Sequence, residues 1–508
     1  MSAGDPEIFL NPLQNPRIEA GMTPDFFRAR LGEMVNPKDP LVVLARQMPW
    51  DEIETYLARF FVRQPKPGQV VEVDDLFGTH AECQGGGVSA AGRKRLPIRL
   101  MASLLYLAHR DNHSDEAVVQ RWSESVPYQH FSGGDDGYYE HRPPCDASQI
   151  SRFRRAIGEE GGEYLLKATV AVAVRMQLVP VEAFQAITVD STVMEKAIAH
   201  PTDSRLLEVA RARIIRVAKA AGFQLKQTFA REAQHLRWKA GGYAHARQFR
   251  RLRRVIRRQR TILGVVLRDV QRQRAACPDS PALAELDTLR VRAERIRTQQ
   301  PKDKNKLYAL HAPEVECIGK GKARKPYEFG VKAGLAITHE HGLIVGARTF
   351  PGNPYDGHTL NEQLEQATIL LEGIAPPPKT VYVDLGYRGV DQDNPDIEII
   401  HRGKLKSLTQ DQRCALKRRQ AIEPVIGHLK ADHRLNRCWL QGETGDAIHA
   451  VLCAVGYNLR WLLRAIARGP LDPAFLCLIG QLLRALKNEG GHACGRPMIG
   501  FRSAYAGS

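Results

Sequence analysis

Features that would place this chain outside the cytoplasm or in a membrane are missing from its 508 residues. Its nine cysteines include no C-x-x-C pair and are odd in number, which argues against a disulfide framework or a structural zinc site. The N-terminus lacks the basic stretch and the apolar run of an export signal. The most apolar long segment, residues 447–467, contains a histidine, an asparagine and two arginines, so we expect a buried or amphipathic helix and no membrane span. These absences predict a cytoplasmic protein.

Acidic residues are scarce in one block, and this block sets the charge of the whole chain. Residues 205–306 contain 27 lysines and arginines and 8 aspartates and glutamates, a net of +19, whereas the whole chain carries +17. Helical periodicity is clear there at residues 209–222 and 249–273. A helix so rich in arginine repels itself unless a polyanion neutralises it, so we expect the block to bind nucleic acid. The arginines assigned to that contact are Arg247, Arg250, Arg251, Arg254, Arg257 and Arg258.

Three helices are expected in the N-terminal part of the chain. Residues 96–109 have helical apolar periodicity, a second helix ends near Trp122, and a third follows Asp146 and Gln149, which have capping-box spacing. The third helix carries three arginines in its first turns. Three short helices with a basic last one are typical of a helix-turn-helix DNA-binding unit, but a helical scaffold or dimerisation module fits the periodicity equally well.

The second half of the chain alternates strand and helix signals. The expected strands are residues 186–190, 329–338, 343–350, 380–384 and 397–400, and the expected helices are residues 359–371 and 419–430. Their order predicts an α/β protein with a mixed sheet flanked by helices. We expect an all-α N-terminal domain for DNA binding and dimerisation at residues 1–180, a core formed by 181–204 and 312–465, a basic helical insertion at 205–311, and a C-terminal helix and tail at 466–508.

Carboxylates stand at the ends of two expected strands and on the last expected helix. A single aspartate after a strand, such as Asp190 or Asp384, is more often a turn former than a ligand. Together with Glu423 on the helix, however, the two supply the minimum oxygen-ligand set for a pair of Mg²⁺ ions. At about 100° per residue, Arg419 and Lys430 share the face of Glu423 and are placed to contact phosphate. The combination indicates phosphoryl transfer on a nucleic acid.

Two loops hold further candidates. Asp356 and His358 are candidates for a second shell around the metal or for a DNA contact, although a turn followed by a helix cap at His358 or Thr359 explains them as well. Residues 386–389, Gly-Tyr-Arg-Gly, form either a tight loop that approaches a ligand or a plain turn. In the first case Arg388 joins the cations that contact phosphate.

These residues resemble those of a known family. Asp190 and Asp384, with Arg419-x3-Glu423-x6-Lys430, are similar to the DDE transposases of bacterial insertion sequences, in the insertion-sequence-five family of the insertion-sequence-four-like group. The likeness continues in residues 189–203, 311–322 and 422–430 and covers about residues 96–463. In the wider group a tyrosine often stands three residues before the signature arginine, where this chain has leucine at position 416.

The resemblance implies a ribonuclease H-like core and an enzyme that cuts at insertion-sequence ends and joins the 3′-hydroxyl ends to target DNA. It also implies two Mg²⁺ ions, with Mn²⁺ as a substitute, held by Asp190, Asp384 and Glu423. The implied partners are double-stranded DNA, as terminal inverted repeats and target, and a second copy of the chain in a synaptic dimer at the bacterial nucleoid. Two alternatives stay open: a Mg²⁺-dependent nuclease or resolvase on the same core, and a catalytically silent DNA-binding protein.

Overall fold

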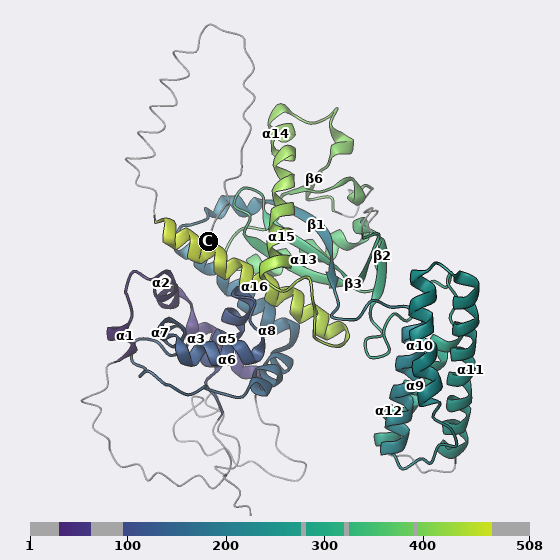
Figure 1. Ribbon diagram of the computed structural model, residues 1–508. Helices are drawn as coiled ribbons and strands as arrows, with labels where there is room; N and C mark the ends of the chain where they lie inside the picture. The colour runs from purple at the N-terminus through teal and green to yellow at the C-terminus, as the bar shows by residue number, and fades with distance from the viewer. Residues whose placement is uncertain (1–29, 62–94, 276–280, 320–324, 390–393, 470–508) are drawn as a thin grey trace, which may run out of the picture.

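The computed structural model describes residues 30–61, 95–275, 281–319, 325–389 and 394–469. In this part of the chain, helices surround one mixed β-sheet, and a group of four long helices stands apart from them (Figure 1). The expected tail at residues 470–508 and the stretches 1–29 and 62–94 of the expected N-terminal domain lie outside the described residues.

The N-terminal part of the described chain is helical. Its helices are α1 (Leu31–Met34), α2 (Pro40–Gln47), α3 (Trp50–Ala58), α5 (Ile98–Arg110), α6 (Asp115–Glu124), α7 (Val126–Gly133) and α8 (Ala147–Arg175). The three predicted helices are α5, α6 and α8, and the Asp146 carboxylate caps α8 by accepting the Ser148 amide. Sequence periodicity did not indicate α2 and α7, which are short and gain stability from packing, including the edge-to-face contact of Phe131 in α7 with Trp50.

One of the three arginines at the start of α8 has a structural role. Arg154 is buried, and its guanidinium lies 2.5 Å from the carboxylate of Asp115 in the first turn of α6. The other two, Arg152 and Arg155, are exposed. Because Arg154 links α8 to α6, only the other two arginines remain on the exposed basic face that the sequence predicted for this helix.

The sheet contains β1 (Ala186–Glu195), β2 (Glu316–Gly319), β3 (Tyr327–Thr338), β4 (Ile344–Phe350), β5 (Thr380–Tyr382) and β6 (Glu398–Ile400). β2 and β4 pair along the outer edge of β3, and the order continues through β1 and β5 to β6. β3 runs antiparallel to both β1 and β4, whereas β5 and β6 run parallel to β1. All five predicted strands are present, and the short β2 was not predicted.

Helices cover the sheet and join it to the N-terminal part. They are α13 (Asp356–Leu371), α14 (Gln410–Arg418), α15 (Ile422–Asp432) and α16 (Gly442–Arg468). α16 packs against α5, α8 and β4, and the Asn458 amide group bonds to the backbone of Ile344 in β4 and to Thr169 in α8. Although α16 is long and apolar enough to cross a membrane, 56% of its most apolar window is buried in the protein, as in a core helix.

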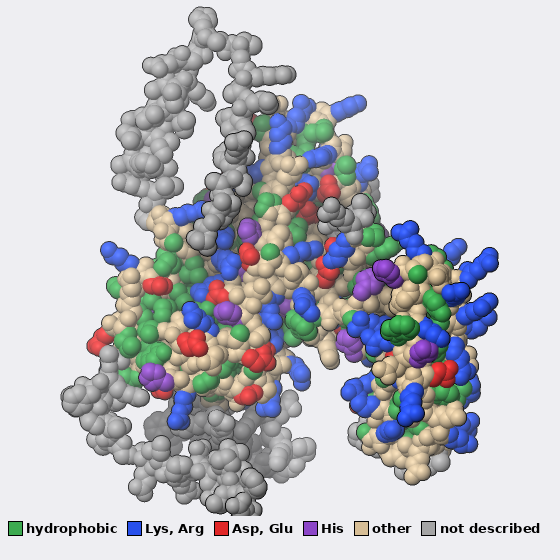
Figure 2. Space-filling view, viewed as in Figure 1, with side chains coloured by type: hydrophobic (Ala, Val, Ile, Leu, Met, Phe, Trp, Pro, Cys, Tyr) green, Lys and Arg blue, Asp and Glu red, His purple; other side chains and the backbone are tan. Residues whose placement is uncertain are grey.

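Between β1 and β2 the chain forms a helical bundle, defined as α9 (Asp203–Ala220), α10 (Ala230–His245), α11 (Phe249–Arg274) and α12 (Pro281–Thr298). α9 and α11 correspond to the two helical stretches expected from the sequence. The bundle has an apolar core of its own, which includes Leu207, Ile214, Leu263 and Leu286. Lysine and arginine side chains project from much of the surface that faces the viewer in Figure 2.

A buried cluster of charged side chains lies where the chain leaves the sheet for the bundle and where it returns. Lys196 follows β1, where the chain departs for the bundle, and its Nζ lies 2.8 Å from a carboxylate oxygen of Glu314, where the chain returns. The same Nζ lies 2.5 Å from Asp446 at the start of α16. All three side chains are buried, so each charge depends on the others for compensation.

We expect Lys196→Met to lower the free energy of unfolding by about 3–5 kcal/mol, because it leaves two buried carboxylates without their cation. Urea denaturation followed by circular dichroism measures this. Lys325→Met is the matched control: Lys325 pairs with Glu195 of β1 but is 52% exposed, so we expect a loss of less than about 1 kcal/mol. Equal effects of the two substitutions would contradict a structural role for the cluster.

Three buried histidines lie where α5, α16 and the loop after α15 meet. The rings of His433 and His449 bond to the backbone carbonyl oxygens of His109 and Arg434 at 2.9 and 3.0 Å. Burial lowers the pKa of both rings to about 4, and it also lowers the pKa of His109. At neutral pH these rings are therefore uncharged in the folded protein.

In the unfolded chain these histidines have a pKa of 6.5, whereas in the folded chain they take up protons only near pH 4. The contribution of the neutral rings to folding stability is therefore complete above pH 6.5 and is lost as pH falls toward 4. We expect His433→Asn and His449→Gln, which keep a donor nitrogen, to flatten the decline of melting temperature between pH 6.5 and 4.5. The exposed His141→Gln should leave the decline unchanged. A decline of wild-type steepness in both buried-site variants would refute this assignment.

Candidate active site

Asp190 and Asp384 lie at the same level on neighbouring parallel strands. The register of β1 with β5 pairs Ala186 with Thr380 and Thr188 with Tyr382. Continued by two residues, this register brings Asp190, in the middle of β1, opposite Asp384, which lies two residues beyond the last residue of β5. Two residues that are 194 positions apart in the sequence therefore come together at one end of the sheet.

Arg419 connects the two aspartates. Its Nη1 lies 3.3 Å from Oδ2 of Asp190 and its Nη2 lies 3.9 Å from Oδ1 of Asp384. The guanidinium side chain is only 7% exposed, whereas that of Asp384 is 53% exposed. Arg419 thus supplies positive charge at the inner side of the pair, and Asp384 leaves the outer side open to solvent.

Burial makes the charge on Asp190 costly. Burial is the largest influence on its pKa and raises it; the Ser191 amide and Arg419 lower it, and the negative charges of Asp384 and Asp356 raise it further. The net result is a raised pKa for Asp190. A carboxylate in this position is stabilised by any additional cation that reaches it.

Asp356 lies beside this pair. One of its carboxylate oxygens accepts a hydrogen bond from the Ser191 hydroxyl at 2.9 Å and lies 3.0 Å from Nζ of Lys332 on β3. The other oxygen approaches Gly386, where a Cβ atom would come within 2.9 Å of it. The sequence indicated Asp356 but missed Ser191 and Lys332. The available signal was a lysine within the largely apolar run of residues 329–338, because a largely buried cation needs a carboxylate partner.

Asp356 also begins α13, so the predicted helix cap at His358 or Thr359 is wrong: the helix starts before both residues. His358 is exposed, and its ring edge lies against Tyr355 with centroids 5.6 Å apart. Of the two candidates in this loop, the structure brings only Asp356 to the aspartate pair.

Glu423 occupies the first turn of α15, a helix that packs against β1, and its side chain is exposed. The structure separates Arg419 from the face of Glu423, whereas Lys430 keeps its predicted spacing from Glu423 within α15. Arg419 belongs to a 3-10 turn before α15 and points inward, and Lys430 is largely buried near Glu328, with Nζ 3.8 Å from its carboxylate. A 3-10 turn advances about 120° per residue, which shifts Arg419 away from the face that α-helical spacing predicts.

Two other residues lie close to the site. Arg388 is exposed just after Asp384, and its Nε donates a weak hydrogen bond to the Leu385 carbonyl oxygen at 3.3 Å. Leu416, which stands where the wider family often has tyrosine, is buried with Tyr382, Ile400 and Leu408. The leucine therefore packs α14 against the end of the sheet.

Two family models match parts of the chain. Residues 29–156 match a family described as Transposase domain (DUF772), and residues 286–459 match one described as Transposase DDE domain. An uncharacterised protein of Rhizobium meliloti, ORF8 in the nfe locus, is 40% identical over 225 residues, which are 44% of this chain and 95% of that protein. The chain belongs to the DDE transposase family. No solved structure matches it.

The two matched regions of the transposase do not cover the whole site. Asp356, Asp384, Arg419 and Glu423 lie within the DDE domain, whereas Asp190 and most of the helical bundle lie outside both matches. The placement of Asp190 in the site therefore depends on the register of β1 with β5.

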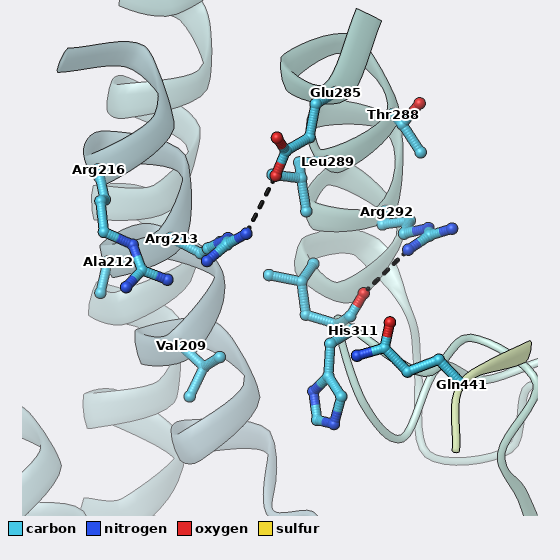
Figure 3. Close-up of a pocket in the computed structure, with 11 residues that line it drawn as sticks. Val209, Ala212, Arg213, Arg216, Glu285, Thr288, Leu289, Arg292, His311 and Gln441 are labelled. Atoms are coloured by element: carbon cyan, nitrogen blue, oxygen red, sulfur yellow. Dashed lines mark hydrogen bonds and ion pairs between the residues drawn. The ribbon is translucent and has the colours of Figure 1, made fainter. Parts of the chain in front are cut away.

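A basic cleft of about 850 Å³ lies at the root of the bundle, away from the aspartates (Figure 3). Side chains on its walls include those of Arg213, Arg216, Arg292, His311 and Gln441. Arg213 pairs with Glu285 across the cleft at 3.0 Å, and Arg292 donates a hydrogen bond to the Leu310 carbonyl oxygen at 3.4 Å. Since one carboxylate faces several cations, the cleft suits an anionic ligand such as a phosphate.

The contact of Arg419 with both aspartates predicts how the transposase binds cations. We expect Arg419→Met to tighten Mn²⁺ binding by on the order of tenfold, because it removes the positive charge that competes for Asp190 and Asp384. Isothermal titration calorimetry without DNA measures this. Arg418→Met is the control, because Arg418 donates only to the backbone oxygens of His339 and Glu340. Unchanged or weaker Mn²⁺ binding in Arg419→Met would contradict the prediction.

Proposed function

We propose that this transposase cuts DNA at the ends of an insertion sequence and joins the resulting 3′-hydroxyl ends to target DNA. The observation that carries the proposal is the alignment of Asp190 and Asp384 on neighbouring parallel strands, with Glu423 on a helix that packs against β1. We assign the catalytic roles to these three carboxylates. Membership of the DDE family supports the assignment, because the family is defined by such a set.

We further propose that the core is ribonuclease H-like. Three antiparallel strands, β4, β3 and β1, are followed by β5 and β6, both parallel to β1, and helices flank this sheet. In this arrangement the carboxyl end of β5 lies beside the middle of β1, next to Asp190. That is where a mixed sheet can present side chains from two distant parts of the chain to one ligand.

The donor set fits divalent ions such as Mg²⁺ or Mn²⁺. The negative charges of Asp384 and Asp356 act on Asp190, and oxygen is the ligand that Mg²⁺ prefers. Within the described residues no group of three acidic, histidine or cysteine side chains is arranged to hold a metal ion, so on this proposal the carboxylates close around the ions when these bind. Two bound ions would activate the attacking oxygen and stabilise the leaving one.

The chain's own residues would do the remaining work. Asp190 and Asp384 hold the ions, and Lys332 and Ser191 keep Asp356 in place beside them. Arg388, exposed next to Asp384, contacts a DNA phosphate. On this proposal Arg419 and Lys430, which form carboxylate contacts here, turn to phosphate when DNA and ions arrive.

DNA binding would extend well beyond the carboxylates. The bundle arginines and the basic cleft supply positive charge on both sides of the point where the bundle joins the core. We assign terminal inverted repeats and target DNA to these surfaces and to the N-terminal helices, in a synaptic homodimer that brings two ends together in the bacterial cytoplasm. We retain the proposed division of the chain into N-terminal domain, core, insertion and tail.

The decisive experiment uses purified protein with Mg²⁺, labelled DNA that carries the flanking ends of the element, and a supercoiled target plasmid. We expect strand-joined product from wild type and a loss of at least about a hundredfold in Glu423→Gln, because the amide cannot supply the anionic ligand. Glu365→Gln, exposed on α13, is the matched control and should retain full activity.

Other outcomes would change the assignment. Cleavage without joining would replace the proposal with a nuclease or resolvase. DNA binding without cleavage or joining, across metals and end sequences, would identify a silent DNA-binding protein. Full joining activity in Glu423→Gln would exclude Glu423 from the triad.

A further inference from the structure

The outer face of α10 presents an aromatic side chain to solvent. Trp238 is 76% exposed, more than any other large hydrophobic residue in the described part of the chain. Helical spacing places Arg231, His235 and Trp238 on one side of α10, whereas Ala233 and Ala240 are buried toward the bundle. The His235 ring lies nearly parallel to the indole, at an interplanar angle of 18° and with centroids 6.4 Å apart. Burying this indole requires a partner other than the described residues.

Two glycines stand one turn beyond Trp238 in the same helix. A Cβ atom added to Gly241 or Gly242 would meet nothing within 4 Å in the described structure, so neither glycine relieves a packing contact there. Each costs the helix about 1 kcal/mol relative to alanine. Gly242 follows Trp238 by four residues and has no side chain, so the helix backbone next to the indole is uncovered. A flat ligand stacked on Trp238 would have room above this backbone.

Positive charge surrounds this face. Residues 230–260, which span α10 and the first half of α11, contain eleven lysines and arginines and one glutamate. That glutamate, Glu232, is already paired with Arg258 at 2.7 Å, which ties α10 to α11. Arg250, Arg254 and Arg257 are exposed on α11. A polyanionic strand is the ligand that this charge favours, and Figure 2 shows how densely lysine and arginine side chains project from the bundle.

We propose that the face formed by His235, Trp238, Gly241 and Gly242 is a stacking site for an unpaired base of DNA, with the strand's phosphates held by the neighbouring arginines. Every base has a π-face, so stacking on an indole is tolerant of sequence, whereas the bases of an intact duplex are already stacked on one another. The inference rests on the proposed DNA-binding role of the bundle and deepens it: the bundle takes single-stranded or locally opened DNA.

The test measures binding of the full-length protein, by fluorescence anisotropy, to a labelled single-stranded oligonucleotide and to the same sequence as a perfect duplex. We expect Trp238→Ala to weaken single-strand binding by on the order of tenfold to a hundredfold while duplex affinity stays within about twofold. Trp238→Phe, which keeps an aromatic face, should restore most of the lost affinity. Trp439→Ala, at an exposed tryptophan outside the bundle, is the control and should leave both affinities unchanged.

A second variant separates loss of stacking from loss of folding. Gly242→Leu should stabilise α10, because leucine has the higher helix propensity, yet it should reduce single-strand affinity by covering the indole. Reduced single-strand binding in both Trp238→Ala and Gly242→Leu, with duplex binding intact, supports the stacking site. Equal effects on the two DNA forms, or no effect on either, overturn it.

The same titrations keep this inference apart from the proposed function. Wild-type protein that binds neither DNA form would overturn both the DNA-binding role of the bundle and the stacking site. A single-strand preference that depends on Trp238, found in protein that does not join strands, would uphold the stacking site and refute the chemistry alone.

Discussion

A largely buried negative charge in the middle of β1 is the constraint on which the rest of the site depends. Asp190 is held there by pairing with Leu335 of β3, just beyond the point where the pairing of β1 with β5 ends, and the negative charges of Asp384 and Asp356 raise the pKa of its carboxyl group. Such crowding is tolerable only with compensating cations, and Arg419 and Lys332 supply them in this structure. In this structure the negative charge of the site is therefore compensated by its own arginine and lysine.

β1 also connects the aspartate site to the bundle. β1 carries Asp190 and then leads within six residues to Lys196, whose buried contacts with Glu314 and Asp446 fix the start of the excursion into the bundle. The short connection gives a physical reason why an insertion with its own apolar core can still be aligned with the aspartates.

Local patterns predicted much of this structure. The five predicted strands, the helices α5, α6, α8, α9, α11 and α13, and the apolar α16 are all present, because each has a periodicity or cap that does not depend on distant residues. The short helix α7 was missed because packing against distant segments, such as the contact of Phe131 with Trp50, stabilises it. Arg419 was wrongly placed on the face of Glu423 because a 3-10 turn precedes α15.

The sequence by itself determined which residue types were available: two aspartates at strand ends, a glutamate on a helix, and a positive block of helices, all of which follow from local composition and spacing. Only the tertiary structure decided which charges meet. Arg154 is buried and pairs with Asp115, Arg419 pairs with Asp190, and Lys332 pairs with Asp356. Trp238, in contrast, is exposed to solvent. The reason is that the free energy of a charge depends on its burial and its neighbours, and chain topology sets both.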